Sequence, residues 1–453
     1  MQSTTTTRPP RGSELELSVH ALAYGGAGVA RAGSYVVFVD GALPGDRVRA
    51  LVYKTKRSFA NARTLEILDP SPDRVDPVAA HPGAPWQVLA YERQLEVKRQ
   101  QVQDALRRIG RLADFELEPI VPAVERWRYR NKLEYSFGDD DGRLVCGFHA
   151  PGRWDEIVEV RDCLLASEAG NAARERVVAW CRESGLQAYD RRTGEGLLRN
   201  LIVREGRRTG EFQIRLITGQ GELDREGLAR AAGAHATAVL WTRSDAVAET
   251  TQGGETELLS GAEWLHEQLA GMRFRLSPEA FFQTNTEMAE RLYATAIEYA
   301  QPHGAESLID LYCGIGTIGL LMAPRVAQVN GLELIPEAVA DAIANARANE
   351  VQNAHFYAGD VRLALRDLIA SSGPPDIAVV DPPRAGLSKK VVRRLIEARP
   401  RRVVYVSCNP TTLAPNAAQL EQAGYRLRRV RPVDMFPQTP HIECVALLER
   451  QDA

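Results

Sequence analysis

Residues 307–319, SLIDLYCGIGTIG, run from an apolar strand into the glycine pattern G-x-G-x-x-G at Gly314, Gly316 and Gly319. Glycines allow the tight turn beneath a bound nucleotide that connects such a strand to a helix. Glu333 ends the next predicted strand, seventeen residues after Gly316, where its carboxylate can accept hydrogen bonds from two ribose hydroxyls. The pattern predicts a site for nicotinamide dinucleotide or S-adenosylmethionine; the alternative is a tight turn without a ligand.

The regular pattern around this motif extends to the C-terminus. From residue 271 onward, helical segments separate the apolar strands SLIDLYC, VNGLELI, HFYAGD, DIAVVD, RRVVYVSC and CVALLE. This alternation predicts an α/β fold with a parallel, doubly wound, Rossmann-like sheet in residues 271–453. Ligands bind at the carboxyl ends of such strands, so Asp381, directly after DIAVV, is expected to face the cofactor. Pro382 and Pro383 make the turn that follows it rigid.

Cys408 ends the strand RRVVYVS at the same predicted edge, and the helical segment LAPNAAQLEQAG follows it. A thiol near a helix start is expected to have a lowered pKa and a larger thiolate fraction. A small buried apolar residue is the commoner state of a cysteine. The position beside the predicted cofactor site nevertheless favours a nucleophile.

The N-terminal part of the chain has a different pattern. Five short strands with glycine or proline turns predict a small OB-like β-barrel in residues 14–68, after a disordered tail of residues 1–13. Residues 69–270 are expected to form a central α+β domain that begins with a linker at 70–77. A helix at about 91–110, with apolar residues at helical spacing and a glycine at its end, is expected to pack on the C-terminal domain.

Composition narrows the class of protein. There is no apolar run long enough for a membrane span and no secretion signal, so we expect a cytoplasmic protein. The six cysteines are scattered, which argues against a disulfide framework or a zinc site. The net charge is only −3, but residues 47–63 hold six basic residues and no acid, and residues 126–132 combine four basic residues with Trp127 and Tyr129. Either stretch is a candidate polyanion contact or simply a solvated charged face.

Five stretches closely resemble motifs of the RNA uridine-5-methyltransferase family. They are FFQTN (281–285), LIDLYCGIGTIGL (308–320), DIAVVDPPRAGL (376–387), YVSCNPTTLAPN (405–416) and PHIECVALLE (440–449). LAYGGAGVAR and LPGDRVRALV are similar to the TRAM domain, an OB-like RNA-binding barrel. The resemblance covers nearly the whole chain. It implies methyl transfer from S-adenosylmethionine to carbon 5 of a uridine in structured RNA.

The resemblance also implies roles for individual residues. Carbon 5 of uracil is a poor nucleophile, and addition of a thiolate at carbon 6 converts the ring to a reactive enolate. The family's nucleophile falls on Cys408, and the base that removes the carbon 5 proton falls on Glu443, although a glutamate there is by itself more often a surface residue. The family's cofactor contacts fall on Gln283, Tyr312, Thr317, Glu333 and Asp381. Thr317 stands where relatives often have asparagine, and Asp360 stands where such folds usually reach the adenine.

One departure from the family concerns cysteine. Many TRAM-bearing relatives carry four cysteines for an iron–sulfur cluster, but the stretch VAAHPGAPWQVLAYERQLEVKRQ contains none and leaves Cys163 as the single candidate. One thiolate cannot hold a cluster, so we expect neither a cluster nor another metal. Relatives with a TRAM domain often act on ribosomal RNA, which favours rRNA over tRNA as the substrate. We expect a monomer without an obligate protein partner.

Three alternatives remain open at this point. A nicotinamide-dependent oxidoreductase would explain G-x-G-x-x-G but neither DPPR nor SCNP. An RNA-binding or RNA-folding protein on a methyltransferase fold would have no need of both Cys408 and Glu443. An enzyme that methylates a base amino group would favour an aromatic residue in place of Arg384 and would not need a thiol.

Overall fold

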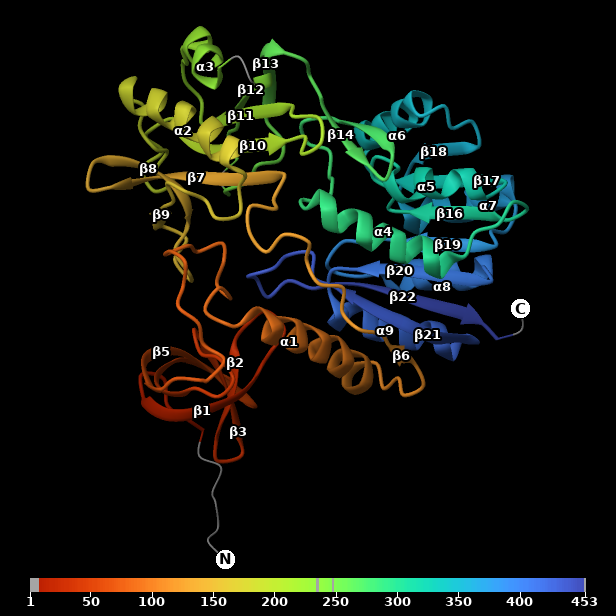
Figure 1. Ribbon diagram of the computed structural model, residues 1–453, viewed down its shortest axis with the longest axis horizontal. Helices are drawn as coiled ribbons and strands as arrows, with labels where there is room; N and C mark the ends of the chain where they lie inside the picture. The colour runs from red at the N-terminus through yellow and green to blue at the C-terminus, as the bar shows by residue number, and fades with distance from the viewer. Residues whose placement is uncertain (1–7, 234–235, 247, 452–453) are drawn as a thin grey trace, which may run out of the picture.

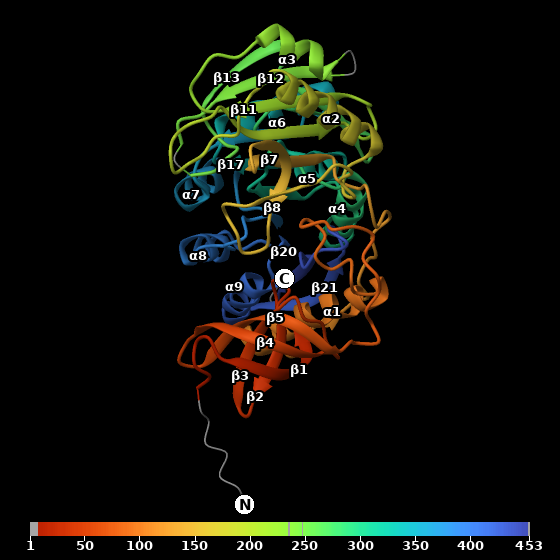
Figure 2. The same cartoon turned by 90° about the vertical axis from the view of Figure 1, so that its left-hand side faces the viewer.

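The computed structural model describes residues 8–233, 236–246 and 248–451. A closed barrel, a seven-stranded sheet and an eight-stranded sheet follow one another along the chain (Figure 1). The barrel and the central seven-stranded sheet lie at opposite ends of the view in Figure 2. The predicted combination of an OB-like barrel, an α+β middle and a C-terminal α/β domain is confirmed.

The barrel is formed by five strands that close in the order β1-β2-β3-β5-β4. The strands are β1 Glu14–Leu22, β2 Gly28–Ala32, β3 Tyr35–Asp40, β4 Arg47–Thr55 and β5 Phe59–Asp69. Buried residues alternate with more exposed ones along β3 and β4, so Val37, Val39, Val48 and Val52 fill the interior.

The chain just before the barrel is attached to it. Of the tail predicted at residues 1–13, residues 1–7 lie outside the described part of the chain. Within residues 8–13, Gly12 N donates to Val52 O (2.7 Å) and Arg8 Nη2 donates to Thr55 O (3.0 Å). Residues 8–13 therefore correct the expected tail, because their polar groups find partners on β4.

The basic run of residues 47–63 is partly neutralised by acids on neighbouring strands. The ion pairs are Arg47–Glu16 (3.0 Å), Arg47–Asp69 (2.6 Å), Arg49–Glu14 (2.9 Å) and Arg49–Glu66 (2.8 Å). β4 lies between β1 and β5, which supply these acids. The exposed cations of the run that form no ion pair within the described chain are Lys54, Lys56, Arg57 and Arg63.

The predicted helix after the linker is present and joins the barrel region to the C-terminal sheet. α1 (Tyr91–Asp104) continues as a five-residue π-helical turn, η1 (Ala105–Ile109), which packs on α9 (Pro410–Gln422). Gly110 has a helical φ of −75°, so it is not a left-handed cap. A Cβ there would lie 2.8 Å from Leu106 O and 2.9 Å from Ala414 O, so close packing explains this glycine.

The central sheet has the strand order β13-β12-β11-β10-β7-β8-β9. Its strands are β7 Lys132–Asp140, β8 Arg143–His149, β9 Ile157–Glu159, β10 Leu198–Glu205, β11 Phe212–Thr218, β12 Ala236–Arg243 and β13 Glu255–Gly261. α2 (Glu168–Glu183) packs on β10, and α3 (Arg225–Ala232) packs on β12 and β13. Val177, Leu201 and Trp241 belong to the shared core.

The C-terminal sheet has the order β18-β17-β16-β19-β20-β22-β21-β6. Its strands are β6 Glu116–Leu117, β16 Ser307–Leu311, β17 Gln328–Glu333, β18 Ala354–Ala358, β19 Ile377–Val380, β20 Arg402–Ser407, β21 Tyr425–Val433 and β22 Glu443–Arg450. The five strands from β18 to β20 are parallel, and β22 runs antiparallel to both β20 and β21. The carboxyl ends of the parallel strands therefore share one edge.

Helices cover both faces of this sheet, as expected for a doubly wound fold (Figure 1). The helices not yet introduced are α4 Thr286–Ala300, α5 Thr317–Met322 with a 3-10 turn η2 at Ala323–Arg325, α6 Pro336–Ala348, α7 Val361–Ser372 and α8 Lys389–Ala398. Residues of α4, α5 and α6 belong to one core cluster, and residues of α7, α8 and α9 belong to the other.

Two short elements connect regions that the sequence separates. β6 lies within the expected central domain but pairs with β21 at the edge of the C-terminal sheet. The hairpin of β14 (Leu265–Leu269) and β15 (Met272–Leu276) packs on α4 and α6. Among the described helices, none has the length and apolar character needed to cross a membrane.

Candidate active site

A hollow opens where the glycine loop after β16 meets Asp381 after β19. Tyr312 and Gly316 in this loop have left-handed φ values of 63° and 85°. A Cβ on Gly316 would lie 2.9 Å from Phe356 and 3.2 Å from Ala342, so the turn requires glycine. The hollow is lined by Phe281, Phe282, Tyr293, Asp310, Tyr312, Cys313, Gly314, Ile315, Thr317, Ile318 and Asp381.

Asp310, inside the strand β16, is a lining residue that the sequence analysis missed. Its Oδ2 accepts a hydrogen bond from Gly319 N (2.9 Å), while its buried Oδ1 has no partner. Burial raises the pKa of Asp310 to about 8, and the charges of Asp381 and Glu333 add to the increase. A buried acceptor without a donor at the wall of a hollow is suited to a ligand that brings one. An acid inside an otherwise apolar strand was the available signal.

Glu333 lies at the end of β17 with its carboxylate against backbone amides. Oε2 accepts from Gly314 N (3.1 Å), and Oε1 accepts from the amides of Leu334 (2.7 Å) and Ile335 (3.0 Å). These three donors hold the carboxylate next to the glycine loop. Thr317, at the start of α5, is buried with its hydroxyl 3.5 Å from that of Tyr293.

Gln283 and Asp360 do not line this hollow. Asp360 caps α7 by accepting from Arg362 N (2.8 Å), and its contact with the Arg362 side chain holds the pKa of Asp360 below its ordinary value. Gln283 is buried directly after Phe282, and its backbone carbonyl accepts from Asn131 Nδ2 (2.9 Å).

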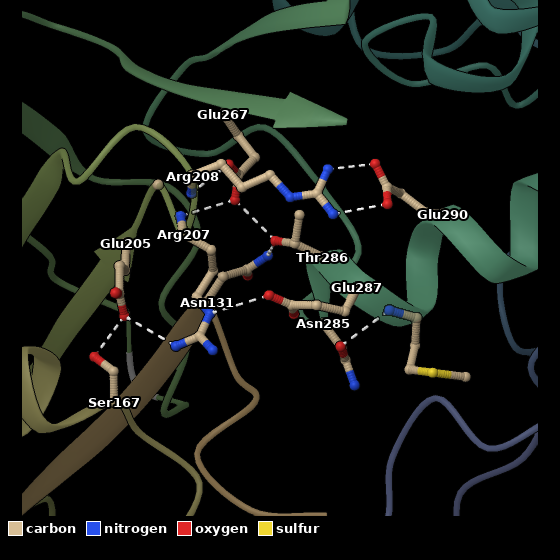
Figure 3. Close-up of polar contacts among 12 residues, drawn as sticks. Asn131, Ser167, Glu205, Arg207, Arg208, Glu267, Asn285, Thr286, Glu287 and Glu290 are labelled. Atoms are coloured by element: carbon tan, nitrogen blue, oxygen red, sulfur yellow. Dashed lines mark hydrogen bonds and ion pairs between the residues drawn. The ribbon is translucent and has the colours of Figure 1, made fainter. Parts of the chain in front are cut away.

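A polar junction between the central and C-terminal domains anchors this segment (Figure 3). Glu267 on β14 accepts from the backbone amides of Arg207 (2.9 Å) and Arg208 (3.1 Å) and from Thr286 Oγ1 (2.8 Å). Asn131 Nδ2 also donates to Thr286 Oγ1 (2.9 Å). Because α4 starts at Thr286, the junction fixes the start of a helix that lines the hollow.

Cys408 and Glu443 lie opposite each other on adjacent strands. In the antiparallel pair of β20 and β22, Ser407 is the partner of Cys444, so Cys408 and Glu443 are the next residues beyond this pair. Asp381 follows β19, the other neighbour of β20. The sheet therefore brings a thiol and two carboxyl groups together beside the hollow, which Asp381 lines and Cys408 and Glu443 do not.

Burial dominates the electrostatics of these three groups. It raises the pKa of Glu443 well above its ordinary value, with a further contribution from Asp381, and it raises the pKa of Asp381 to about 7. The pKa of Cys408 is raised to about 12 by burial and then by the charges of Glu443 and Asp381, while Arg384 lowers it. The predicted lowering of the thiol pKa is wrong here, because burial and two acids outweigh the helix start. A positive charge entering this cluster would favour the ionised forms.

Arg384 and Asn409 complete the wall beside the thiol. Asn409 caps α9 by accepting from Thr411 N (3.0 Å), and its Nδ2 donates to Arg384 O (3.0 Å). Tyr24 of the barrel donates from its hydroxyl to Cys408 O (3.1 Å). The sequence analysis did not find Asn409 or Tyr24. Asparagine before proline at a helix start was a capping signal for Asn409, but no pattern connects Tyr24 to a residue 384 positions away.

Residues 126–132 are partly or fully buried, apart from the exposed Arg126. Tyr129 is fully buried, and its hydroxyl donates to Pro437 O (3.1 Å), so it cannot stack on an external base. Arg126 pairs with Glu92 (3.1 Å), and Arg128 pairs with Asp162 (2.9 Å). Trp127, which is partly buried, packs against the central core.

Cys163 lies in a buried pocket with His81 from the segment after the linker. Cys163 Sγ is 3.3 Å from His81 Nε2. Burial raises the pKa of Cys163 and lowers that of His81 to about 4. In the described part of the chain, no group of three or more potential ligands is arranged to hold a metal ion.

Comparisons with known proteins agree with this geometry. Residues 255–451 match the model of the tRNA (uracil-5-)-methyltransferase family, and residues 10–65 match the TRAM domain. An uncharacterized RNA methyltransferase of Halalkalibacterium halodurans is 37% identical over 443 residues, covering 96% of both chains. A Porphyromonas gingivalis RNA methyltransferase is also 37% identical, over 96% of this chain and 99% of the relative. The crystal structure of Pyrococcus abyssi tRNA (uracil-54, C5)-methyltransferase with S-adenosyl-L-homocysteine has a TM-score of 0.79 and 28% identity, over 96% of this chain and 99% of that one.

A glycine loop, an acid at the next strand end and a TRAM barrel on a doubly wound sheet define an S-adenosylmethionine-dependent RNA methyltransferase. Given the extent of the similarity, the chain belongs to the family of RNA (uracil-5-)-methyltransferases. The resemblance deduced from the sequence is confirmed, and so is the choice of cofactor.

Proposed function

We propose that this enzyme methylates carbon 5 of a uridine in structured RNA through a covalent adduct with Cys408, and that Glu443 is the base. The observation that carries the proposal is the position of Cys408 opposite Glu443, at the end of the strand next to the one that Asp381 follows. The pairing of a thiol with a carboxyl group of raised pKa suits a reaction that needs both a nucleophile and a base.

The residues present fit S-adenosylmethionine. Asp310 offers an unpartnered acceptor at the wall of the hollow, and the carboxyl groups of partly buried Asp381 and buried Glu443 have no cationic partner within the described chain. When bound, S-adenosylmethionine supplies an electrophilic methyl group on a positively charged sulfur. We assign Glu333 to the ribose and Tyr312, Thr317, Gln283 and Asp381 to the rest of the cofactor. Asp360 remains a weaker candidate for the adenine, because its carboxylate already binds Arg362.

The two reactive side chains act in sequence. Cys408 loses its proton to solvent and adds to carbon 6 of the uracil, which gives an enolate. Carbon 5 of the enolate then takes the methyl group from the sulfur of S-adenosylmethionine, and S-adenosylhomocysteine is left. Glu443 then removes the remaining proton from carbon 5, the bond between sulfur and carbon 6 breaks, and the thiolate leaves. A raised pKa makes the Glu443 carboxylate a stronger base for this step.

The substrate is proposed as a uridine that leaves its base stack, because the ring must reach Cys408, which is partly buried. Ribosomal RNA is the first candidate, since the chain carries a TRAM barrel. Transfer RNA is the second, because the similar Pyrococcus abyssi enzyme is a tRNA (uracil-54, C5)-methyltransferase. We assign the barrel of residues 14–68 to RNA binding and place a monomeric enzyme in the cytoplasm.

The direct test is methyl transfer from labelled S-adenosylmethionine to total RNA of a strain that lacks the gene. We expect label in 5-methyluridine, at positions found by comparing modified nucleosides in RNA with and without the gene. Label in a base amino group, or no label in any RNA, would refute the proposal.

A further inference from the structure

The loop between β1 and β2 of the barrel, residues 23–27, reaches the nucleophile. The Tyr24 hydroxyl donates to Cys408 O (3.1 Å) and accepts from Arg384 Nη2 (3.4 Å). The Arg384 guanidinium lies 5.8 Å from the centre of the Tyr24 ring. One barrel side chain thus touches both the nucleophile's backbone and Arg384, the cation that lowers the pKa of its thiol.

The loop is fixed in this place by contacts with the rest of the protein. Gln101 Nε2 of α1 donates to Leu22 O (2.9 Å) and Ala23 O (3.1 Å). Gly26 has a φ of 97°, and a Cβ there would lie 3.1 Å from both Pro440 and Trp86. Tyr24 packs against the core cluster that includes residues of α7, α8 and α9. Its position is therefore part of the fold and needs no bound RNA.

Arg384 depends on Tyr24 for its orientation. The backbone carbonyl of Arg384 is held by Asn409 Nδ2 (3.0 Å) and Thr412 Oγ1 (3.3 Å), but its guanidinium forms no ion pair with any described acid. Within the described chain, the Arg384 guanidinium contacts the hydroxyl and the ring of Tyr24. Without the hydroxyl, the guanidinium would be free to turn away from Cys408.

We propose that Tyr24 is a positioning residue of the active site, through which the barrel holds Arg384 and the Cys408 backbone in the arrangement that the covalent step needs. The TRAM barrel then has a second role besides RNA binding. Deleting the whole barrel would remove both roles at once and could not tell them apart. This inference rests on the proposed role of Cys408 as the nucleophile.

The charges around Cys408 decide the direction of the effect. Glu443 on β22 and Asp381 after β19 raise the pKa of the thiol, and Arg384 lowers it, while Cys444 and Tyr24 are the other titratable neighbours. If Arg384 is released, the thiol should ionise at higher pH.

The test uses the full-length Tyr24→Phe variant, which keeps the ring and removes the hydroxyl. The rate of alkylation of Cys408 by iodoacetamide is measured against pH by mass spectrometry without RNA. We expect a rate about threefold to tenfold lower at pH 8 and a profile displaced to higher pH. Tyr53→Phe is the matched control, since it removes an exposed barrel hydroxyl that bonds Asp40 (2.9 Å).

A second measurement uses labelled S-adenosylmethionine and total RNA from a strain that lacks the gene. At saturating RNA, methyl transfer by Tyr24→Phe should fall about threefold to tenfold, while RNA affinity stays within about twofold. Weaker RNA binding with an unchanged maximal rate would show that Tyr24 is only an RNA contact and would overturn the proposal. An unchanged alkylation profile would overturn it as well.

Gly26→Ala provides an independent disturbance of the same loop, and Gly33→Ala is its control. Both glycines have positive φ, but a Cβ at Gly33 meets nothing within 4 Å. Gly26→Ala should reproduce the slower alkylation, and Gly33→Ala should not. The alkylation assay needs no RNA, so it tests the Tyr24 contact separately from the proposed function. Slower alkylation of Tyr24→Phe together with normal methylation by Cys408→Ala would support the Tyr24 contact and refute the proposed function.

Discussion

The carboxylates at the functional edge of the C-terminal sheet form two groups that differ in their partners. On β17 and after β18, Glu333 receives three backbone N–H groups and Asp360 binds Arg362. The second group has no cationic partner within the described chain: Asp310 on β16 and Glu443 at the start of β22 are buried, and Asp381 after β19 is partly buried. The first group is already satisfied, while the second has raised pKa values.

This difference separates carboxylates with fixed partners from carboxyl groups that can exchange a proton or meet the charge of a ligand, along a single edge. A carboxylate that is held by fixed donors keeps its charge and its direction, which suits it to orient a ligand. A buried carboxyl group without such partners holds its proton near neutral pH and can exchange it, which suits a base. The comparison predicts that substitutions in the two groups will have effects of different kinds.

The largest effect on methyl transfer is expected from substitutions of Cys408 and Glu443. Cys408→Ala should lower methyl transfer by roughly a thousandfold or more, because the enolate cannot form. Glu443→Gln should still add the thiolate and accept the methyl group but should not release the product. The methylated adduct would then appear as a labelled RNA–protein band in denaturing electrophoresis.

The double variant Cys408→Ala, Glu443→Gln is the control for this band and should lack it. Normal turnover by Glu443→Gln would remove the base assignment. A band that persists without Cys408 would remove the nucleophile assignment.

The next largest effect, on cofactor affinity, is expected in the group with fixed partners. Glu333→Ala should weaken S-adenosylmethionine binding about tenfold to a hundredfold, because a charged acceptor for ribose hydroxyls is lost. RNA affinity should stay the same. Asp360→Asn should change cofactor affinity by less than about threefold, since its carboxylate is engaged with Arg362. Calorimetry measures both, and equal losses for the two variants would contradict the assigned ribose contact.

A smaller effect concerns the charge of Glu443 on the thiol. Ionised Glu443 helps to raise the pKa of Cys408 to about 12, so Glu443→Gln should lower this pKa and speed alkylation by up to about tenfold between pH 9 and 10. Glu333→Gln, in the other group, should leave the alkylation rate unchanged. A slower reaction in Glu443→Gln would mean that Glu443 assists deprotonation of the thiol.

The smallest effect is on stability and depends on pH. The pKa of Asp381 is about 7 in the folded protein and near its ordinary value of 3.8 when unfolded, so ionisation of Asp381 lowers the stability of the wild type as pH rises from about 4 to 7. Asp381→Asn cannot ionise. Its midpoint of thermal unfolding should match the wild type near pH 4 and exceed it by a few degrees at pH 8.

Asp360→Asn is the counterpart of this variant in the group with fixed partners. The pKa of Asp360 is lowered by Arg362, so its contribution to stability is present above the unfolded pKa and is lost as pH falls. At pH 8 its replacement should therefore leave the unfolding midpoint unchanged or lower it slightly. An equal upward displacement in both variants would break the comparison.

The sequence by itself determined the barrel, the doubly wound sheet and the strand ends that carry Glu333, Asp381 and Cys408. Strand periodicity fixes which residues end each strand, and parallel strands place these ends on one edge. Motif similarity added Glu443, whose position opposite Cys408 depends on a pairing between strands that the chain pattern does not specify. The buried acid of β16, Asp310, was visible in the sequence but not distinguished from the apolar residues around it.

The tertiary structure decided the partners and therefore the charges. Acids from β1 and β5 neutralise Arg47 and Arg49, Tyr129 is buried, and the thiol of Cys408 has a raised pKa instead of a lowered one. Tyr24 reaches Cys408 across 384 positions of sequence. Solvation and Coulomb interactions depend on distances in space and on burial, which the order of residues along the chain leaves open until the domains pack together.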